Sequence, residues 1–275
     1  MAEKAKGKIL KNVSRREFLK DAGLLAGGAA IGSTVFLVSC AIDAETVTAT
    51  SIITQTNTNM VPGSPQGETI SNGILIGEGG ELPKPLMDGN ISIERTLLTR
   101  RSIRTYSGEA LTITEVSQLL WAAQGVTRTE YSFRTVPSAG ALYPLETYIV
   151  VGDVDNLSPG AYHYTPEHHQ LNKVLNGDIR RELAVSALGQ TWVLEGAINI
   201  IFTSIFERTT KIYGERGIRY VYMEVGHAAQ NVYLQAVALD LGTVVIGSFY
   251  DDRVRDILKL PLNEQPLYIM PVGRI

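Results

Sequence analysis

A long polar stretch, residues 43–81, divides this chain into parts that cannot share one hydrophobic core. Thr, Ser, Asn, Gly and Pro dominate the stretch, and residues 46–59 are almost wholly polar or small. Such a segment buries too little apolar surface to offset the entropy lost on ordering, so we expect residues 41–81 to form a flexible tether. The folded unit is therefore expected at residues 82–275, a length typical of a single domain.

Composition supports one folded unit and argues against several classes of protein. The 275 residues are 44% hydrophobic and 19% charged, which allows a sizeable core. One cysteine cannot close an intramolecular disulfide, and with four histidines it makes a poor set of zinc ligands, so we expect no metal site. Residues 1–40 carry seven basic and three acidic residues. Residues 41–275 therefore carry 18 basic and 25 acidic residues, a net charge of −7. This charge argues against a nucleic-acid partner.

Residues 1–40 have the three-part layout of an export signal. Four lysines precede Arg15 and Arg16, and the run 22–38 that follows is uncharged and rich in Ala, Gly and Leu. The adjacent arginines, followed by Phe-Leu-Lys, resemble a twin-arginine signal, whose pathway exports folded proteins. We therefore expect export by the twin-arginine route.

The only cysteine lies at the end of the uncharged run. Leu37-Val38-Ser39-Cys40 resembles a lipobox, in which the cysteine is lipidated and becomes the first residue of the mature chain. The alternative is an uncleaved signal anchor, because about twenty uncharged residues just span a bilayer. Either interpretation predicts a protein held at the extracytoplasmic face of the cell membrane, and lipidation of Cys40 is the favoured one.

Helix and strand patterns alternate through residues 82–275 and predict a mixed α/β sandwich. Ser92 caps a helix that runs towards Thr99, and Thr112 with Glu115 forms a capping box for a helix that stops at Gly125. Further helices are expected at 179–188, 218–241 (ending at Gly242) and 251–258. Strands are expected at 147–151, 161–164, 170–174, 198–203, 243–246 and 268–272, with irregular stretches near 165 and 210. In the long helix, Gly226, Ala228 and Ala229 fit either core packing or a subunit interface.

Three short segments carry residues suited to a phosphate or a flat ring. The first has the guanidinium groups of Arg100, Arg101 and Arg104 with the hydroxyl of Ser102, which suit phosphate oxygens, although a solvated face is the alternative. The second is Gly273-Arg274, at the end of an apolar strand. The third, residues 137–144, has small residues between two prolines, which either admit a flat ring or form a structural turn.

Taken in order, these segments resemble the FMN-dependent nitroreductase superfamily, and its SagB-type branch in particular. The resemblance extends over residues 82–274. Eight segments carry it: 82–85, 100–104, 120–125 (Leu-Trp-Ala-Ala-Gln-Gly), 137–146, 213–220, 224–231, 246–251 and 271–274. It implies an α+β fold, a three-layer α/β sandwich, and a homodimer that binds FMN at the subunit interface.

The resemblance also implies roles for individual residues. Arg100, Arg101 and Ser102 match the part of the motif that holds the FMN phosphate and ribityl chain, Arg104 matches the basic residue near flavin N1 and O2, and Gly273-Arg274 matches a second phosphate site. Pro137, Ser138, Ala139 and Gly140 match the loop that the partner subunit lays against the flavin, and Gly247 matches the position whose amide approaches N5.

The catalytic candidates are Lys211 and Tyr213. Relatives that oxidise azoline rings in peptides use a Lys-Tyr pair to assist proton removal, but here Ile212 separates the two residues, which argues against that reaction. We expect an exported, membrane-tethered FMN oxidoreductase that transfers hydride to or from a small-molecule or peptide substrate. The alternatives are a peptide azoline dehydrogenase, an enzyme that uses oxygen, and a binding lipoprotein without turnover.

Overall fold

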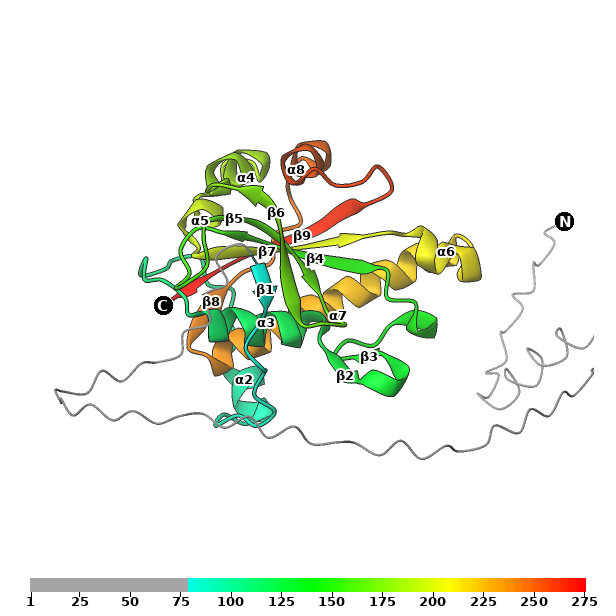
Figure 1. Cartoon of the computed structure of the whole chain (residues 1–275), viewed down its shortest axis with the longest axis horizontal. Coiled ribbons are helices and arrows are strands. Elements are labelled where there is room, and N and C mark those ends of the chain that lie inside the picture. Colours follow the sequence, from blue (N-terminus) through cyan, green and yellow to red (C-terminus); the bar gives the residue numbers. More distant parts are fainter. Residues whose placement is uncertain (1–78) are drawn as a thin grey trace, which may run out of the picture. The chain divides into compact units, whose positions relative to one another are not determined.

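One seven-stranded antiparallel sheet organises residues 79–275, the part of the chain that the computed structural model describes (Figure 1). The spatial order of its strands is β1-β6-β5-β4-β7-β9-β8. The strands are β1 (Gly79–Glu81), β4 (Leu145–Val151), β5 (Gly160–Thr165), β6 (Gln170–Asn176), β7 (Ile198–Ser204), β8 (Leu241–Thr243) and β9 (Gln265–Arg274). The predicted export signal, Cys40 and nearly all of the predicted tether lie outside the described residues.

Helices cover both faces of this sheet, as the separate positions of α4 and α8 and of α3 and α7 show in Figure 1. The helices of one face are α2 (Ile93–Thr99), α3 (Ile113–Gln124) and α7 (Arg216–Ala238), and those of the other are α4 (Arg180–Ser186), α5 (Thr191–Glu195) and α8 (Asp251–Leu258). The predicted three-layer α/β sandwich is therefore confirmed.

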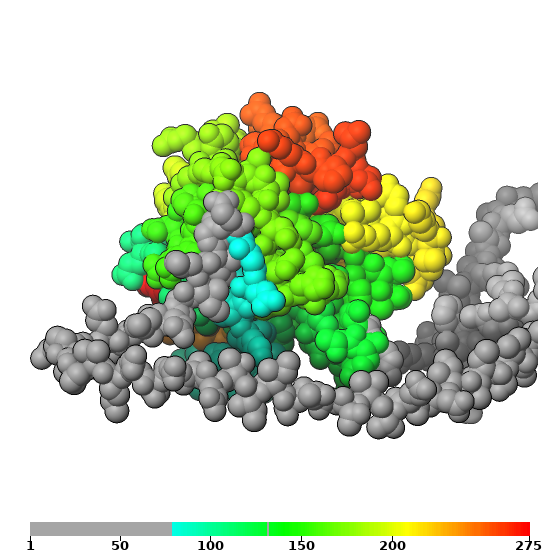
Figure 2. All heavy atoms as spheres, in the orientation of Figure 1, coloured from blue at the N-terminus to red at the C-terminus, as the bar shows by residue number. Residues whose placement is uncertain are grey.

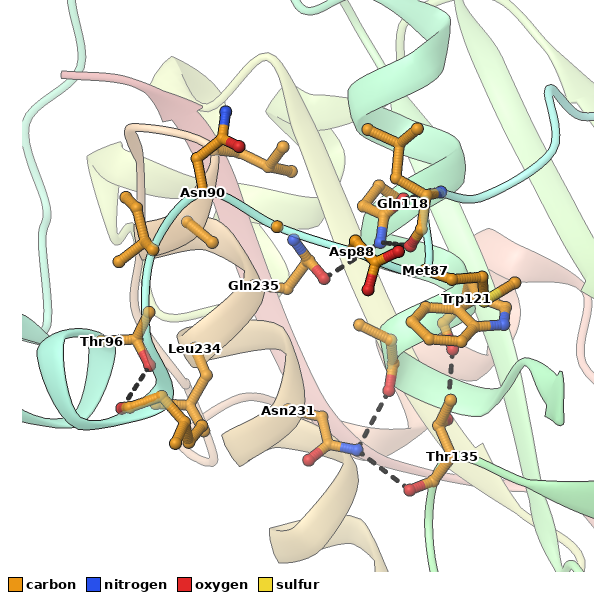
Figure 3. Close-up of a pocket in the computed structure, with 17 residues that line it drawn as sticks. Met87, Asp88, Asn90, Thr96, Gln118, Trp121, Thr135, Asn231, Leu234 and Gln235 are labelled. Atoms are coloured by element: carbon orange, nitrogen blue, oxygen red, sulfur yellow. Dashed lines mark hydrogen bonds between the residues drawn. The ribbon is translucent and has the colours of Figure 1, made fainter.

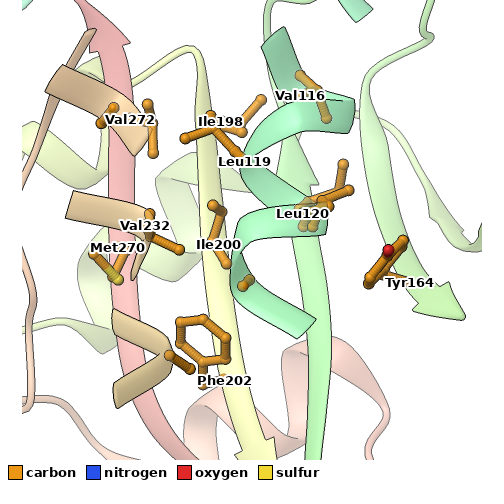
Figure 4. Close-up of a cluster of buried hydrophobic side chains, with 14 of the residues drawn as sticks. Val116, Leu119, Leu120, Tyr164, Ile198, Ile200, Phe202, Val232, Met270 and Val272 are labelled. Atoms are coloured by element: carbon orange, nitrogen blue, oxygen red, sulfur yellow. The ribbon is translucent and has the colours of Figure 1, made fainter. Parts of the chain in front are cut away.

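Alternation along β7 divides the core between the two faces. Ile198, Ile200 and Phe202 point towards α3 and α7, whereas Ile201 packs with the helices of the opposite layer. Figure 4 shows the first cluster, in which Leu119 and Val232 lie over β7 and β9. All these side chains are fully buried. The apolar residues of this strand thus contribute to both cores.

Most predicted helices and strands occur near their expected bounds, and their caps explain why. Ser92 accepts a hydrogen bond from the Arg95 amide, and the Thr112–Glu115 capping box opens α3, which Gly125 ends. Ala228 and Ala229 are buried in the core, whereas Gly226 is exposed with open space around it.

Several elements differ from the prediction. The long helix ends at Ala238 rather than at Gly242, because Asp240 takes a left-handed conformation (φ 56°) and Gly242 already belongs to β8. The stretch near 210 is helical, α6 (Glu207–Tyr213). The elements that had no prediction are α5, the hairpin of β2 (Val126–Arg128) and β3 (Phe133–Arg134), and the 3-10 turns η1 (Thr129–Tyr131) and η2 (Ala139–Ala141). Strand β1 was not predicted either: it pairs with β6, although the expected tether includes residues 79–81.

Candidate functional site

The segment with the predicted phosphate-binding arginines crosses the sheet edge at β8 and β9. The Ile103 amide donates to the Thr243 carbonyl at 2.9 Å. Gly273 lets the segment lie this close, because a Cβ there would be 2.7 Å from the Tyr106 ring. The Tyr106 ring thus occupies the space beside Gly273 that the sequence interpretation reserved for a ligand.

Tyr233 on α7 joins this segment to the chain that follows β8. Its hydroxyl lies 2.9 Å from the Ser102 hydroxyl and accepts a hydrogen bond from the Val245 amide at 2.8 Å. The Arg100 guanidinium lies over the Tyr233 ring, 5.1 Å from its centroid. Tyr233 therefore fixes two predicted site residues beside segment 243–248, a role that its position in a helical stripe did not indicate.

Arg104 and Ser248, the residue after Gly247, contact the same short segment of chain, residues 190–192. The Arg104 guanidinium lies 5.5 Å from the centroid of the Trp192 ring, and the Gln190 side chain donates to the Ser248 carbonyl at 3.1 Å. Segment 243–248 therefore passes from Arg100 and Ser102 at one end to the neighbourhood of Arg104 at the other. We call Arg100, Ser102, Arg104 and Gly247 the basic half-site.

Two of the four arginines have partners that compete with a phosphate. The Arg274 guanidinium lies 3.0 Å from the Glu115 carboxylate and 3.7 Å from that of Glu109. Arg101 donates to the backbone carbonyls of Leu98 and Arg100. This arrangement differs from the expected one, in which Arg274 turns its charge towards the same anion as Arg100.

The predicted flavin loop lies elsewhere, between β3 and β4. Ser138 begins the turn, and its hydroxyl oxygen accepts a hydrogen bond from the Tyr143 amide at 2.9 Å. Gly140 has φ 64°, and a Cβ there would lie 2.9 Å from the Tyr213 hydroxyl. The structure therefore brings together Tyr213 and the loop of residues 137–140, two predicted parts of the site that are far apart in the sequence. We call this the loop half-site.

The two catalytic candidates do not form a pair on α6. Lys211 and Tyr213 are two positions apart on a helix, so their side chains leave it in different directions. Tyr213 turns to Gly140 and packs edge to face with Tyr220, 5.2 Å between ring centroids. In Figure 2 the surface of α6, in yellow, adjoins green surface, and the Arg208 side chain of α6 donates a hydrogen bond to the Tyr143 carbonyl of the loop.

A buried carboxylate lies beneath this loop and had no role in the sequence interpretation. Glu224, on α7, is 2% exposed, and its Oε1 atom has no hydrogen-bond partner among the described residues. Burial raises the pKa of Glu224 to about 7, against the opposing effects of the Ser138 hydroxyl and the positive charge of Arg134. The only signal in the sequence is an acidic residue on the apolar face of a helix.

A cavity of about 680 Å³ lies between α2, α3, α7 and the chain that leads into α2 (Figure 3). Its polar groups include Gln118, whose side chain bonds to both backbone groups of Leu86, and Asn231, which donates to the Ala122 and Thr135 carbonyls. The remaining lining is mostly apolar, with Trp121 at one side. None of the described residues that line it is among the predicted site residues.

Comparison with known proteins gives a family and several relatives. The model of the nitroreductase family matches residues 97–274. The provisionally named nitroreductase MJ1384 of Methanocaldococcus jannaschii is 49% identical over 199 residues, 72% of this chain and 98% of that protein. The FMN reductase (NADPH) of Bacillus subtilis is 25% identical over 198 residues, 67% of this chain and 66% of that protein.

Solved structures show the same fold. A provisionally named nitroreductase from Anabaena variabilis has a TM-score of 0.60 and 37% identity, and the match covers 66% of this chain but 38% of that one. In the Escherichia coli microcin synthetase McbBCD complex with truncated pro-MccB17, the matching chain has a TM-score of 0.56 and 25% identity, over 70% of this chain and 76% of that one. The chain therefore spans well under half of the Anabaena protein.

Proposed function

Because this chain belongs to the nitroreductase family, whose members are FMN oxidoreductases, we propose that its folded unit is an FMN-dependent oxidoreductase. Bound FMN supplies the redox chemistry, and the protein binds, orients and tunes it. The observation that carries the proposal is the basic half-site. In it Arg100 lies over Tyr233 and Arg104 over Trp192, and the side chains of Tyr233 and Gln190 bond to the chain on either side of Gly247.

The charges of the basic half-site fit the cofactor. Among the described residues, Arg100 and Arg104 lie over aromatic rings rather than against carboxylates. Their guanidinium donors therefore remain available for an anion, as a phosphate or a negatively charged flavin requires. Arg274 fits less well, because Glu115 already neutralises it.

The backbone at Gly247 fits a flat ring. Gly247 is exposed, and a Cβ there would touch only the Tyr268 ring at 3.5 Å, an ordinary van der Waals contact. The chain's own packing thus leaves room for a side chain. Close approach of a ligand to the backbone explains a glycine at this position.

Titration of the purified folded unit with FMN tests the proposal. We expect tight binding, followed by flavin fluorescence quenching, and loss of affinity by at least tenfold in Arg100→Ala and Arg104→Ala. Arg181→Ala, an exposed arginine of α4, is the matched control and should bind as the unchanged protein does. A protein that takes up no FMN would refute the proposal.

We further propose a homodimer in which each FMN site uses both chains. The two half-sites lie at different places along α7: Tyr233 contacts the basic half-site, whereas Tyr213, just before α7 begins, contacts the loop half-site. One chain therefore holds the two half-sites separately. Large apolar side chains are exposed on α2 and α7: Leu97 and Leu98 at 54% and 65%, Tyr222 and Met223 at 54% and 52%. A second copy would cover such surfaces.

Sedimentation analysis tests the dimer. We expect Leu98→Glu with Met223→Glu to give a folded monomer, because each substitution places a charge in the proposed interface. The exposed Val185→Glu on α4 is the control and should leave the dimer intact. A protein that is monomeric before any substitution would contradict the proposal.

For the substrate, we infer a SagB-type dehydrogenase whose chemistry differs from azoline oxidation. The likeness to a microcin synthetase chain favours a peptide substrate, but the directions of Lys211 and Tyr213 on α6 oppose the paired proton transfer. The protein can be incubated with an azoline-containing peptide, and azole formation followed by mass spectrometry. This experiment distinguishes azoline oxidation from a different dehydrogenase reaction. Turnover that is lost in both Lys211→Ala and Tyr213→Phe would favour the azoline reaction.

For localisation, we propose export by the twin-arginine route and a lipid anchor at Cys40. The adjacent Arg15 and Arg16 and the lipobox-like sequence support this. Within residues 79–275, no helix combines the length and apolarity needed to cross a bilayer. Cys40→Ala should abolish lipid labelling, and Arg15→Lys with Arg16→Lys should block export. Unchanged membrane recovery of Cys40→Ala would favour an uncleaved anchor.

A further inference from the structure

The cavity between α2, α3 and α7 shares no lining residue with either half-site and has no role in the proposed function. Its volume of about 680 Å³ is in the range of small-molecule pockets. Among the described residues that line it, apolar side chains predominate, Asp88 is the one charged residue, and none is a lysine, arginine or histidine. The lining therefore offers no cation to a phosphate or a carboxylate, so an anionic ligand is disfavoured.

Gln118 of α3 begins a chain of amide hydrogen bonds along one wall of the cavity (Figure 3). Its Oε1 atom accepts from the Leu86 amide at 2.8 Å, and its Nε2 atom donates to the Leu86 carbonyl at 3.1 Å. The same Nε2 atom donates to Oε1 of Gln235, on α7, at 3.2 Å. Because Gln235 presents its oxygen to Gln118, its own Nε2 atom faces away from Gln118 and has no partner among the described residues.

Asn231 lies one helical turn before Gln235 and has the opposite polarity. Its Nδ2 atom donates to two backbone carbonyls, that of Ala122 at 3.1 Å and that of Thr135 at 3.3 Å. Those two acceptors determine which end of the amide is the nitrogen, and its Oδ1 atom lies on the opposite side in Figure 3. Within the described part of the chain, this oxygen has no donor.

Gln235 and Asn231 thus present one hydrogen-bond donor and one acceptor to the cavity that they line. Residues four apart on a helix lie on the same face, with their Cβ atoms about 5–6 Å apart. Both side chains belong to half-buried residues, so their polar ends are partly withdrawn from water and favour a ligand that pairs with both. Amide groups carry an N–H beside a C=O and bear no charge, which fits this pattern.

The wall that carries the pair is held in place by its own hydrogen bonds. The Thr135 amide donates to the Gly125 carbonyl at 2.9 Å, and the Thr135 hydroxyl donates to the Trp121 carbonyl at 3.1 Å. These bonds fasten the chain after β3 to the end of α3, and Asn231 joins α7 to the same junction. The donor and the acceptor are therefore positioned before a ligand arrives, which reduces the entropy lost on binding.

We propose that this cavity is a second binding site, which takes an uncharged amide that carries an apolar side chain. A carbonyl of the ligand accepts from Nε2 of Gln235, and an N–H of the ligand donates to Oδ1 of Asn231. The apolar side chain lies against Trp121 and Leu234. The site goes beyond the proposed function and does not depend on FMN.

Trp121 provides the signal that tests this site. The chain has two tryptophans, and the other, Trp192, lies beneath Arg104, so Trp192→Phe leaves the fluorescence of the cavity alone. The probes are N-acetyl-leucinamide and N-acetyl-leucine, which has a carboxylate in place of the terminal amide. We expect the neutral probe to give a saturable fluorescence change and the anion to bind at least tenfold more weakly. Calorimetry on the unchanged protein should give the same affinities.

Gln235→Glu removes the donor and keeps the rest of the site. The carboxylate still accepts from Gln118 but has a second oxygen where Gln235 has its –NH₂ group, so N-acetyl-leucinamide should bind at least tenfold more weakly. The matched control is Gln230→Glu, the same change on the same helix, because Gln230 does not line the cavity. It should bind the probe as the unchanged protein does.

A longer probe, N-acetyl-Ala-Leu-Ala-amide, distinguishes the two sources of such a ligand. Tighter binding than that of N-acetyl-leucinamide would support a peptide, and equal binding would support a small amide.

Three results would overturn the proposal. The first is a neutral probe that gives no saturable signal, and the second is an equal affinity in Gln235→Glu. The third is binding that appears only in Leu98→Glu with Met223→Glu, which would mean that a second copy of the chain fills the cavity. All these measurements use protein without FMN, so a failure of the proposed function leaves them unaffected.

Discussion

At the scale of single residues, the predicted site residues include glycines that the fold requires and one that it does not. Gly140 has a left-handed backbone and Tyr213 beside it, and Gly273 admits the Tyr106 ring. Gly247 has neither constraint. A glycine without a structural reason, in the same half-site as two arginines that have no carboxylate partner among the described residues, is the strongest local indication of a ligand site.

Alanine substitutions at two of these glycines should give opposite results. Gly140→Ala should lower the free energy of unfolding by about 1–2 kcal/mol, because of its φ and the close Tyr213 hydroxyl. Gly247→Ala should leave it unchanged but weaken FMN binding roughly tenfold by crowding the ring. Urea unfolding measures the free energy of unfolding, and FMN titration measures the affinity. Equal FMN affinity in Gly247→Ala would argue against a ring at this position.

The titration of Glu224 should appear in the stability of the protein. Its pKa is raised in the folded state, so the stability associated with the neutral carboxyl is fully present below the unfolded pKa of 4.5 and is lost as pH rises to about 7. The loss corresponds to roughly 3 kcal/mol, and Glu224→Gln should remove it. Unfolding free energies from pH 4.5 to 8 provide the measurement. Parallel curves for the two proteins would contradict the assignment.

At the scale of elements, the end of the chain is fastened to the start of α3. Glu115 accepts hydrogen bonds from the Thr112 amide and hydroxyl, and it also pairs with Arg274 at the end of β9. One carboxylate thus serves as a helix cap and as the partner of the last strand.

The Arg274 charge should therefore matter more for stability than for the cofactor. Arg274→Met should lower the unfolding free energy by about 1 kcal/mol, because the pair is partly buried, and should change FMN affinity less than twofold. Arg100→Met should instead leave the unfolding free energy unchanged and weaken FMN binding. A tenfold loss of FMN affinity in Arg274→Met would restore its predicted role as a phosphate ligand.

The sequence predicted elements best where local signals act alone. The cap at Ser92 and the box at Thr112 determine where α2 and α3 begin, and the run of β-branched and aromatic residues in β7 is sufficient by itself to predict a strand. In contrast, α6 has no side-chain N-cap hydrogen bond, and it packs against α7. The helix α7 ends because Asp240 takes a left-handed conformation. Glycine is the usual sequence signal for that conformation, and position 240 has none.

The site, like the elements, was predicted only where local sequence signals determine it. Motif positions identified the segments of both half-sites, but not the residues that hold them. Tyr233 and Trp192 act through contacts with distant segments, so nothing local distinguishes them. The pairing of Arg274 with Glu115 likewise depends on the position of α3 beside β9 in the folded structure.

At the scale of the whole molecule, a site divided between two chains would depend on mass action. If FMN binds where the basic half-site of one chain meets the loop half-site of another, dilution below the dimer dissociation constant should release the cofactor. We expect the FMN affinity to decrease as the protein is diluted. In the double variant Leu98→Glu with Met223→Glu, the affinity should be low at every protein concentration. Fluorescence titrations at several protein concentrations provide the test, and an affinity independent of dilution in a dissociating protein would place the whole site within one chain.

The long helix α7 carries Tyr233, which contacts Arg100 and Ser102, and it begins just after Tyr213, which contacts the loop of residues 137–140. In the proposed dimer these two contacts serve different flavins, so one stiff helix reaches from one active centre to the other. A tilt or shift of this helix at one centre would be transmitted to the second centre. Cooperativity between the two turnover cycles would then need only the rigidity of about six turns of helix.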